Sequence, residues 1–136
     1  MSIHARLNWT DGSQFVARVG NGSAIVIDTP EGGSGPTPMG ILLIGVAGCT
    51  AVDVVAILKK KRVNMTGFQI NITGERAEKE PKRYTNIHIE YIVTGKDVKP
   101  KALEHAIQLS EKKYCSAIAS LNSTVTNSYR IVEPDE

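Results

Sequence analysis

Apolar and polar residues alternate through the first part of the chain, a pattern typical of β-strands with one buried face. Two dipeptides, Asp11-Gly12 and Asn21-Gly22, interrupt the alternation, and such pairs favour tight hairpin turns. The sequence therefore predicts a three-strand antiparallel meander, with strands over 3–9, 14–19 and 23–28.

A long, almost uncharged run follows a loop that is rich in glycine and proline. Thr37 is a suitable helix cap, and Pro38 suits the first helical position. The basic residues Lys59 and Arg62 suit the negative end of a helix dipole. We therefore predict a helix from Pro38 to about Arg62.

The apolar stretch 41–58 within this helix is long enough to span a membrane. Asp53 interrupts it, however, and Gly45 and Gly48 lower its hydrophobicity. A core helix that is apolar on nearly all sides has the same pattern, so we expect a buried helix and no membrane partner. Because one small sheet covers only one side of such a helix, we expect a second subunit to cover the rest.

The second half of the chain alternates between strand-like and helix-like patterns. Two strand-like stretches predict a long hairpin with one wet face, and a helix that opens at Pro100 and breaks after Tyr114 follows them. This order of elements belongs to the α+β class, and we expect a single domain over 1–136. The predicted elements are strands over 68–73, 84–93 and 125–132, and helical segments over 100–114 and 115–121.

Composition narrows the class of protein. Of the 136 residues, 41% are apolar and 22% charged, which suits a soluble globular protein. The formal net charge of +2 is too small to argue for nucleic-acid binding. The segment 1–7 has no apolar stretch of the kind found in secretory signals, so we expect the cytoplasm, where thiols stay mostly reduced.

The two cysteines, Cys49 and Cys115, are the strongest candidates for chemistry. Cys49 lies in mid-helix with Asp53 one turn further on, and a nearby carboxylate raises the pKa of a thiol. Cys115 begins a new helical segment beside Lys112 and Lys113, a setting that lowers the pKa of a thiol. Local physics therefore favours Cys115 as the more reactive thiol, although either cysteine could be an inert buried residue.

Other candidate sites have weaker patterns. The three histidines, His4, His88 and His105, are isolated, and no zinc-binding spacing of His or Cys occurs. The glycine-rich segment 32–35 lacks the Lys-Ser/Thr ending of a phosphate-binding loop. We therefore expect neither a metal nor a cofactor.

Two segments bring a known family into view. The stretch Gly35 to Leu58, centred on Gly45-Val-Ala-Gly-Cys-Thr-Ala-Val-Asp53, resembles the central helix of the OsmC/Ohr family. The segment Tyr114-Cys-Ser-Ala-Ile-Ala-Ser-Leu121 resembles the region of that family's second cysteine. The resemblance covers nearly the whole chain and is strongest to the short OsmC-like subgroup. It implies an OsmC-like fold, with antiparallel sheets packed on a long buried central helix in an intertwined homodimer.

The resemblance also implies an activity, because many members of this family are thiol peroxidases that reduce organic hydroperoxides. By position, Cys49 matches the cysteine that attacks the peroxide, and Cys115 matches the resolving cysteine. The implied cycle passes from a thiolate through a sulfenic acid to a disulfide, which an external dithiol then reduces.

One part of the family pattern is different in this chain. Ohr-type members carry a glutamate at the position of Met39, and that glutamate orients an arginine that stabilises the reactive thiolate. Arg18 is the nearest candidate for this arginine and Arg6 the next, although Arg18 could equally be a solvent-facing strand residue. Two further functions therefore stay open: a redox-responsive or small-molecule-binding protein with little or no peroxidase turnover, and a purely structural dimer module.

Overall fold

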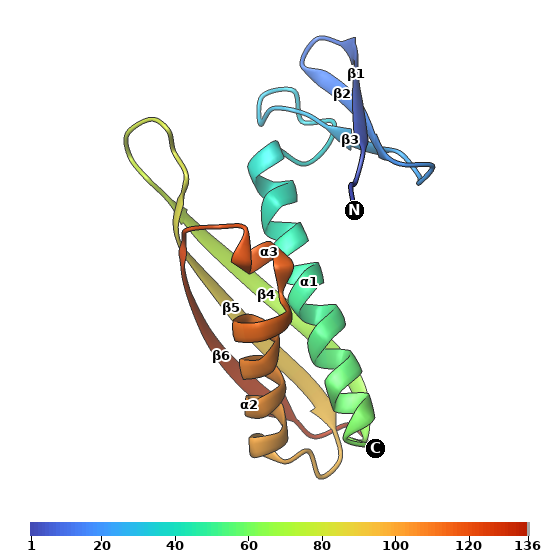
Figure 1. Cartoon of the computed structure of the whole chain (residues 1–136), viewed down its shortest axis with the longest axis vertical. Coiled ribbons are helices and arrows are strands. Elements are labelled where there is room, and N and C mark those ends of the chain that lie inside the picture. The colour runs from blue at the N-terminus through green and yellow to red at the C-terminus, as the bar shows by residue number, and fades with distance from the viewer. Residues whose placement is uncertain (136) are drawn as a thin grey trace. The chain divides into compact units, whose positions relative to one another are not determined.

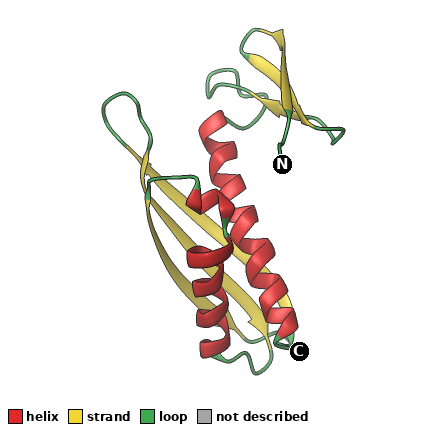
Figure 2. Ribbon diagram, viewed as in Figure 1, coloured by secondary structure: helices red, strands yellow, loops and turns green. Residues whose placement is uncertain are grey.

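The computed structural model describes residues 1–135 and divides into two compact units, Met1–Leu42 and Leu43–Glu136 (Figure 1). Each unit contains one three-stranded sheet, and the helices complete an α+β fold, as predicted (Figure 2). The expectation of a single domain over 1–136 stays a prediction.

The N-terminal unit is built on the predicted antiparallel meander. Its strands are β1 (Ala5–Asp11), β2 (Gln14–Val19) and β3 (Ile25–Ile27), paired in the order β1-β2-β3. Phe15 of β2 pairs with Trp9 on one side and with Ile27 on the other. The strong turn dipeptides explain why the sequence located these strands to within two residues.

The loop that follows β3 is held by one buried carboxylate, Asp28. Asp28 accepts hydrogen bonds from the side chains of Ser13 and Ser34 and from the backbone N–H groups of Thr29 and Ser34. These bonds keep the pKa of the Asp28 carboxyl far below its usual range, the Ser13 bond having the largest effect. A glycine- and proline-rich segment thereby acquires a defined path to the next helix.

Helix α1 spans Pro38–Lys60 and begins at the predicted residue. Thr37 Oγ1 accepts a hydrogen bond from the N–H of Gly40 at 3.1 Å, so Thr37 serves as the predicted cap. The expectation of burial on nearly all sides is wrong for one chain, because only one stripe is buried and Val52 is 71% exposed. One sheet covers only one side of a helix, so the opposite side of α1 stays exposed in a single chain. The buried stripe consists of Val46, Thr50, Val54 and Leu58.

By length and composition alone, α1 could cross a membrane. In the most apolar 18-residue window of the helix, 22% of the residues are buried. A core helix of a soluble protein has the same length and hydropathy.

The second sheet consists of β4 (Met65–Arg76), β5 (Tyr84–Gly95) and β6 (Thr124–Val132). The expectation of purely antiparallel sheets is wrong here, because β6 pairs with β5 in parallel. Parallel neighbours require a crossover connection, and the helical segment between β5 and β6 supplies it. The long hairpin of β4 and β5 is antiparallel, as predicted.

The crossover connection contains three helical pieces. They are α2 (Pro100–Leu109), the π-helix η1 (Ser110–Tyr114) and the short α3 (Ser116–Ala119). Leu103 and Ala106 of α2 are fully buried, as are alternate residues of β5. The core of this unit therefore lies between one face of the sheet and the helices drawn across it in Figure 1. The fully buried residues of β5 are Ile87, Ile89, Tyr91 and Val93.

Candidate functional site

The two cysteines, remote in sequence, meet in the second unit. Cys49 on α1 and Cys115 at the start of α3 lie close enough for Cys49 to raise the pKa of the Cys115 thiol. Cys49 is half-buried, Cys115 is 3% exposed, and neither is in a disulfide. Two thiols that lie near each other can cycle between a dithiol and a disulfide.

Cys115 caps helix α3, as its place after the break predicted. Its sulfur accepts a hydrogen bond from the N–H of Ile118 at 3.4 Å. The expectation that this position lowers the thiol pKa is nevertheless wrong. The pKa of Cys115 is raised to about 11, because burial and the neighbouring Cys49 thiol raise it by more than the hydrogen bond from Ile118 lowers it. A helix of four residues is too short to offset that desolvation.

A π-helical turn brings the residues before Cys115 into the core. In η1 the N–H of Cys115 donates to the carbonyl of Ser110 at 2.7 Å, which closes a wider turn than an α-helix does. As a result, the consecutive side chains of Ser110 and Glu111 both form hydrogen bonds with residues on other elements. Ser110 Oγ donates to Asp53 Oδ2 on α1 at 2.9 Å. Asp53 therefore connects α1 to the turn that carries the second thiol.

A buried tyrosine is hydrogen-bonded to the π-helical turn that precedes Cys115. Tyr91 of β5 is fully buried, and its hydroxyl donates to Glu111 Oε2 at 2.6 Å. Burial, the bond to Glu111 and the charges of Glu111 and Cys115 all raise the pKa of Tyr91, and a hydrogen bond with Thr50 opposes them. Tyr91 therefore keeps its proton and acts as a hydrogen-bond donor to the carboxylate.

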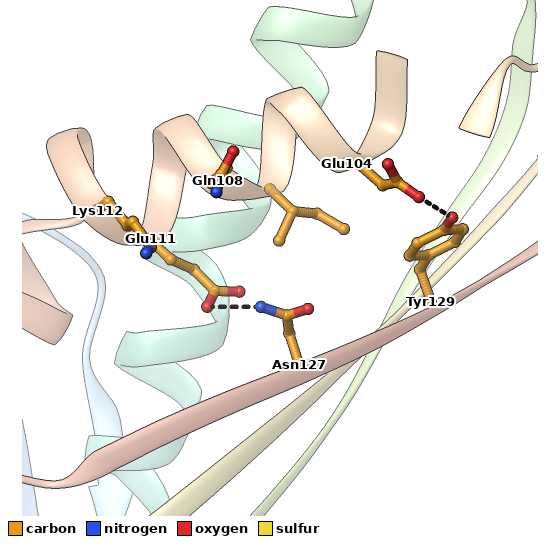
Figure 3. A pocket seen from close by; sticks show the side chains of 7 residues that line it. Glu104, Gln108, Glu111, Lys112, Asn127 and Tyr129 are labelled. Atoms are coloured by element: carbon orange, nitrogen blue, oxygen red, sulfur yellow. Dashed lines mark hydrogen bonds between the residues drawn. The ribbon is translucent and has the colours of Figure 1, made fainter. Parts of the chain in front are cut away.

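Glu111 also faces a polar pocket between the α2–η1 segment and β6. Its Oε1 accepts a hydrogen bond from Asn127 Nδ2 at 3.1 Å, and Tyr129 in the same pocket donates to Glu104 Oε1 at 2.5 Å (Figure 3). One oxygen of Glu111 thus faces the buried tyrosine and the other faces the pocket. The pocket is lined by Glu104, Ile107, Gln108, Glu111, Lys112, Asn127 and Tyr129.

Sequence reasoning did not find Tyr91 and Glu111 as part of the site. Tyr91 belongs to the predicted strand 84–93, and Glu111 belongs to a charged run beside the predicted break. The only local signal is that Glu111 lies one helical turn before Cys115. The hydrogen bond between Tyr91 and Glu111 depends on how β5 packs against η1, and no local sequence pattern predicts that packing.

The two candidate arginines lie in the N-terminal unit, on neighbouring strands. Arg18 of β2 is directly opposite Arg6 of β1 in the sheet register. Arg18 is exposed, and its Nη1 donates to the carbonyl of Gly22 at 3.4 Å. Its role at the thiols stays a prediction.

Among the residues that the structure describes, no group of three or more His, Cys, Asp or Glu side chains could hold a metal ion. His88 has hydroxyl partners instead, Thr126 at 2.7 Å and Ser128 at 2.9 Å on the neighbouring strand.

Comparison with known proteins gives consistent results. Residues 31–129 match the profile of the OsmC-like protein family. Protein YhfA of Escherichia coli K12 is 38% identical over 132 residues, covering 96% of this chain and 98% of the relative. A hypothetical protein of Aquifex aeolicus VF5 has a crystal structure that superposes with a TM-score of 0.89 at 34% identity, covering 99% of both chains. The organic hydroperoxide resistance protein OhrB of Bacillus subtilis shares the fold, with a TM-score of 0.63 at 13% identity over 96% of this chain and 98% of its own. This chain therefore belongs to the OsmC-like protein family.

Proposed function

We propose that this protein is a thiol-dependent peroxidase that reduces organic hydroperoxides in the cytoplasm through Cys49 and Cys115. The observation that carries the proposal is that two free thiols from distant parts of the chain lie near each other. The fold shared with a protein named for organic hydroperoxide resistance supports the same chemistry.

The difference between the thiols assigns their roles. Cys115 is buried and its pKa is raised to about 11, so it is a poor first nucleophile at neutral pH. Cys49 is the more exposed sulfur, and a peroxide reaches it more readily. Cys49 attacks the O–O bond, the alcohol leaves, and Cys49 becomes a sulfenic acid. Cys115 then displaces hydroxide to form the disulfide, and an external dithiol restores both thiols.

The test is peroxide consumption by the purified, reduced protein. Cumene hydroperoxide and a dithiol reductant are supplied, and peroxide loss is measured against a Cys49→Ser variant. We expect turnover in the wild type and none above background in Cys49→Ser. Equal rates in the two proteins would refute the proposal.

A second candidate function is a redox-responsive or small-molecule-binding protein with little turnover. Two observations favour it: Met39 stands where Ohr-type members carry a glutamate, and Arg18 is bonded to a backbone carbonyl of its own hairpin. Under this alternative, hydroperoxide oxidises the cysteines once but the protein does not consume excess peroxide when the dithiol is present.

We also propose that the protein acts as a homodimer. The support is the exposed apolar side of α1, where Ile44 is 61% exposed and Val52 is 71% exposed. A mostly apolar surface lined by Ala51, Val52, Val55, Ala56 and Lys59 lies on this side of the helix. Large exposed apolar patches mark interaction surfaces, and a second copy of the chain is the partner that the family implies.

A further inference from the structure

Disulfide formation between Cys49 and Cys115 makes a strict geometric demand on the two segments that carry them. The Cα atoms of a disulfide lie about 4.4–6.8 Å apart, and a larger separation leaves the sulfur atoms out of reach. Cys49 belongs to the long helix α1, whereas Cys115 follows a π-helical turn and begins a helix of four residues. A helix this short has little stability of its own, so its position depends on contacts with other elements.

We propose that the hydrogen bond between Ser110 and Asp53 holds Cys115 in position for disulfide formation with Cys49. Ser110 and Asp53 are positioning residues, and neither takes part in the attack on the peroxide. This inference rests on the proposed function, because it concerns the step in which Cys115 displaces hydroxide from the Cys49 sulfenic acid.

A short chain of contacts through Ser110 connects the two segments. Cys49 and Asp53 are four residues apart on α1 and therefore lie on the same face of the helix. Ser110 Oγ donates to Asp53 Oδ2 at 2.9 Å. The carbonyl of Ser110 accepts a hydrogen bond from the N–H of Cys115 at 2.7 Å. Ser110 thus bonds the helix of one cysteine through its side chain and the backbone of the other cysteine through its carbonyl.

The surroundings of Ser110 make this bond a strong constraint. Ser110 is fully buried, so its hydroxyl cannot exchange the carboxylate of Asp53 for water without a large cost. A hydrogen bond from a hydroxyl to a carboxylate is charge-assisted and roughly twice as strong as one between neutral groups. Val54, the residue after Asp53, is also fully buried, so this part of α1 is firmly packed.

The π-helical turn has a second set of anchors, which lead to the sheet. Glu111 accepts hydrogen bonds from Tyr91 of β5 at 2.6 Å and from Asn127 of β6 at 3.1 Å. These bonds hold η1 to the sheet, whereas the bond of Ser110 holds it to α1. We therefore expect loss of the Ser110 bond to let the two thiols move apart while the turn stays attached to the sheet.

The chain offers a matched control for the loss of one hydrogen bond. Tyr129 of β6 donates to Glu104 of α2 at 2.5 Å, and this bond also joins a hydroxyl and a carboxylate from different elements (Figure 3). It involves neither η1 nor the two segments that carry the cysteines. Tyr129→Phe therefore removes a bond of the same kind in the same unit without affecting the proposed contact.

The experiment measures how strongly the two thiols of the full-length protein favour the disulfide. The protein is equilibrated with mixtures of reduced and oxidised dithiothreitol, and mass spectrometry gives the fraction with the Cys49–Cys115 disulfide. The S–S bond of oxidised dithiothreitol breaks as that of the protein forms, and the two cysteine protons pass to dithiothreitol, so no peroxide is needed. The variants are Asp53→Ala, Ser110→Ala, the double variant and the conservative Asp53→Asn, with Tyr129→Phe as the control.

We expect Asp53→Ala and Ser110→Ala each to shift the equilibrium toward the dithiol about tenfold, the effect of one lost hydrogen bond to a charged group. For a two-electron couple this shift raises the reduction potential by about 30 mV. The double variant shows no larger shift, because both substitutions remove the same bond. Asp53→Asn keeps an oxygen that accepts the bond, so its potential stays close to that of the wild type, as does the potential of Tyr129→Phe.

A second measurement links this contact to the proposed cycle. Reduced protein receives one equivalent of cumene hydroperoxide, and samples are quenched at successive times. Mass spectrometry then counts the Cys49 sulfenic acid, trapped with dimedone, and the disulfide. We expect Ser110→Ala to form the sulfenic acid at the wild-type rate and the disulfide more slowly, because the two sulfur atoms are less well aligned.

Four outcomes overturn the inference. Wild-type potentials in Asp53→Ala and Ser110→Ala exclude the positioning role and leave the peroxidase proposal intact. A shift in Asp53→Asn as large as that in Asp53→Ala shows that the charge of the carboxylate acts, and not the bond. An equal shift in Tyr129→Phe shows a general loosening of the unit. A wild type that forms no Cys49 sulfenic acid refutes the proposed function, and with it a role of Ser110 in that cycle.

Discussion

The burial of Cys115 sets its chemistry more strongly than its position at a helix start does. Two backbone N–H groups, of Ile118 and Ala117, stabilise the thiolate, yet the pKa of Cys115 is raised to about 11. Desolvation in a site that is 3% exposed is the larger effect. The helix start therefore lowers the pKa of the Cys115 thiol, but burial raises that pKa by more.

This shift predicts a pH dependence of stability. In the unfolded chain the thiol of Cys115 has its ordinary pKa of 9.0, whereas in the folded protein its pKa is raised to about 11. Raising the pH through this range deprotonates the unfolded state first, so stability falls. We expect reduced Cys115→Ala to lose less stability than the wild type between pH 9 and 11, measured by urea unfolding. Parallel losses in both proteins would contradict the raised pKa.

At the scale of the elements, the loop between β3 and α1 is held by hydrogen bonds to one side chain, that of Asp28, in place of regular backbone hydrogen bonds. Asp28 gathers bonds from Ser13, Thr29 and Ser34, and a side chain on Gly32 would collide with the Asp28 carboxylate. The missing Cβ of glycine is what allows the backbone to come this close.

Replacing Asp28 with alanine is expected to loosen this loop. The amides of Thr29 and Ser34 lose their acceptor, so their hydrogen exchange becomes faster. Glu31→Ala, an exposed change in the same loop, serves as the control and leaves exchange unaltered. Because the pKa of Asp28 is lowered, the wild-type loop keeps its protection as the pH falls to 4 and loses it only in stronger acid. Unchanged exchange in Asp28→Ala would show that other contacts hold the loop.

At the scale of the whole molecule, α1 has an apolar side that a single chain leaves exposed to solvent. Leu58 and Val54 on the buried stripe are fully covered, whereas Val52 and Ile44 face outward. Burying such side chains contributes about 1.5–3 kcal/mol each. A homodimer is expected to bury them.

The substitution Val52→Glu tests this assembly. A carboxylate at the centre of an apolar interface loses its hydration without a partner, so we expect the dimer to dissociate. Size-exclusion chromatography with light scattering measures the mass in solution. Val132→Glu, at a strand end that is 37% exposed, is the control and should keep the wild-type mass. A dimeric Val52→Glu protein would place the interface elsewhere.

The sequence by itself determined the N-terminal meander, the start of α1 at Pro38 and the break after Tyr114, because these depend on turn residues, caps and local periodicity. It also identified the two cysteines as the candidate reactive groups. It also marked α1 as too apolar for one sheet to cover. Only the tertiary structure decided that β6 runs parallel to β5, that Cys49 lies near Cys115, and that Tyr91 donates a hydrogen bond to Glu111. Those pairings, and the raised pKa of Cys115, depend on contacts and burial between distant segments, which no local pattern of residues contains.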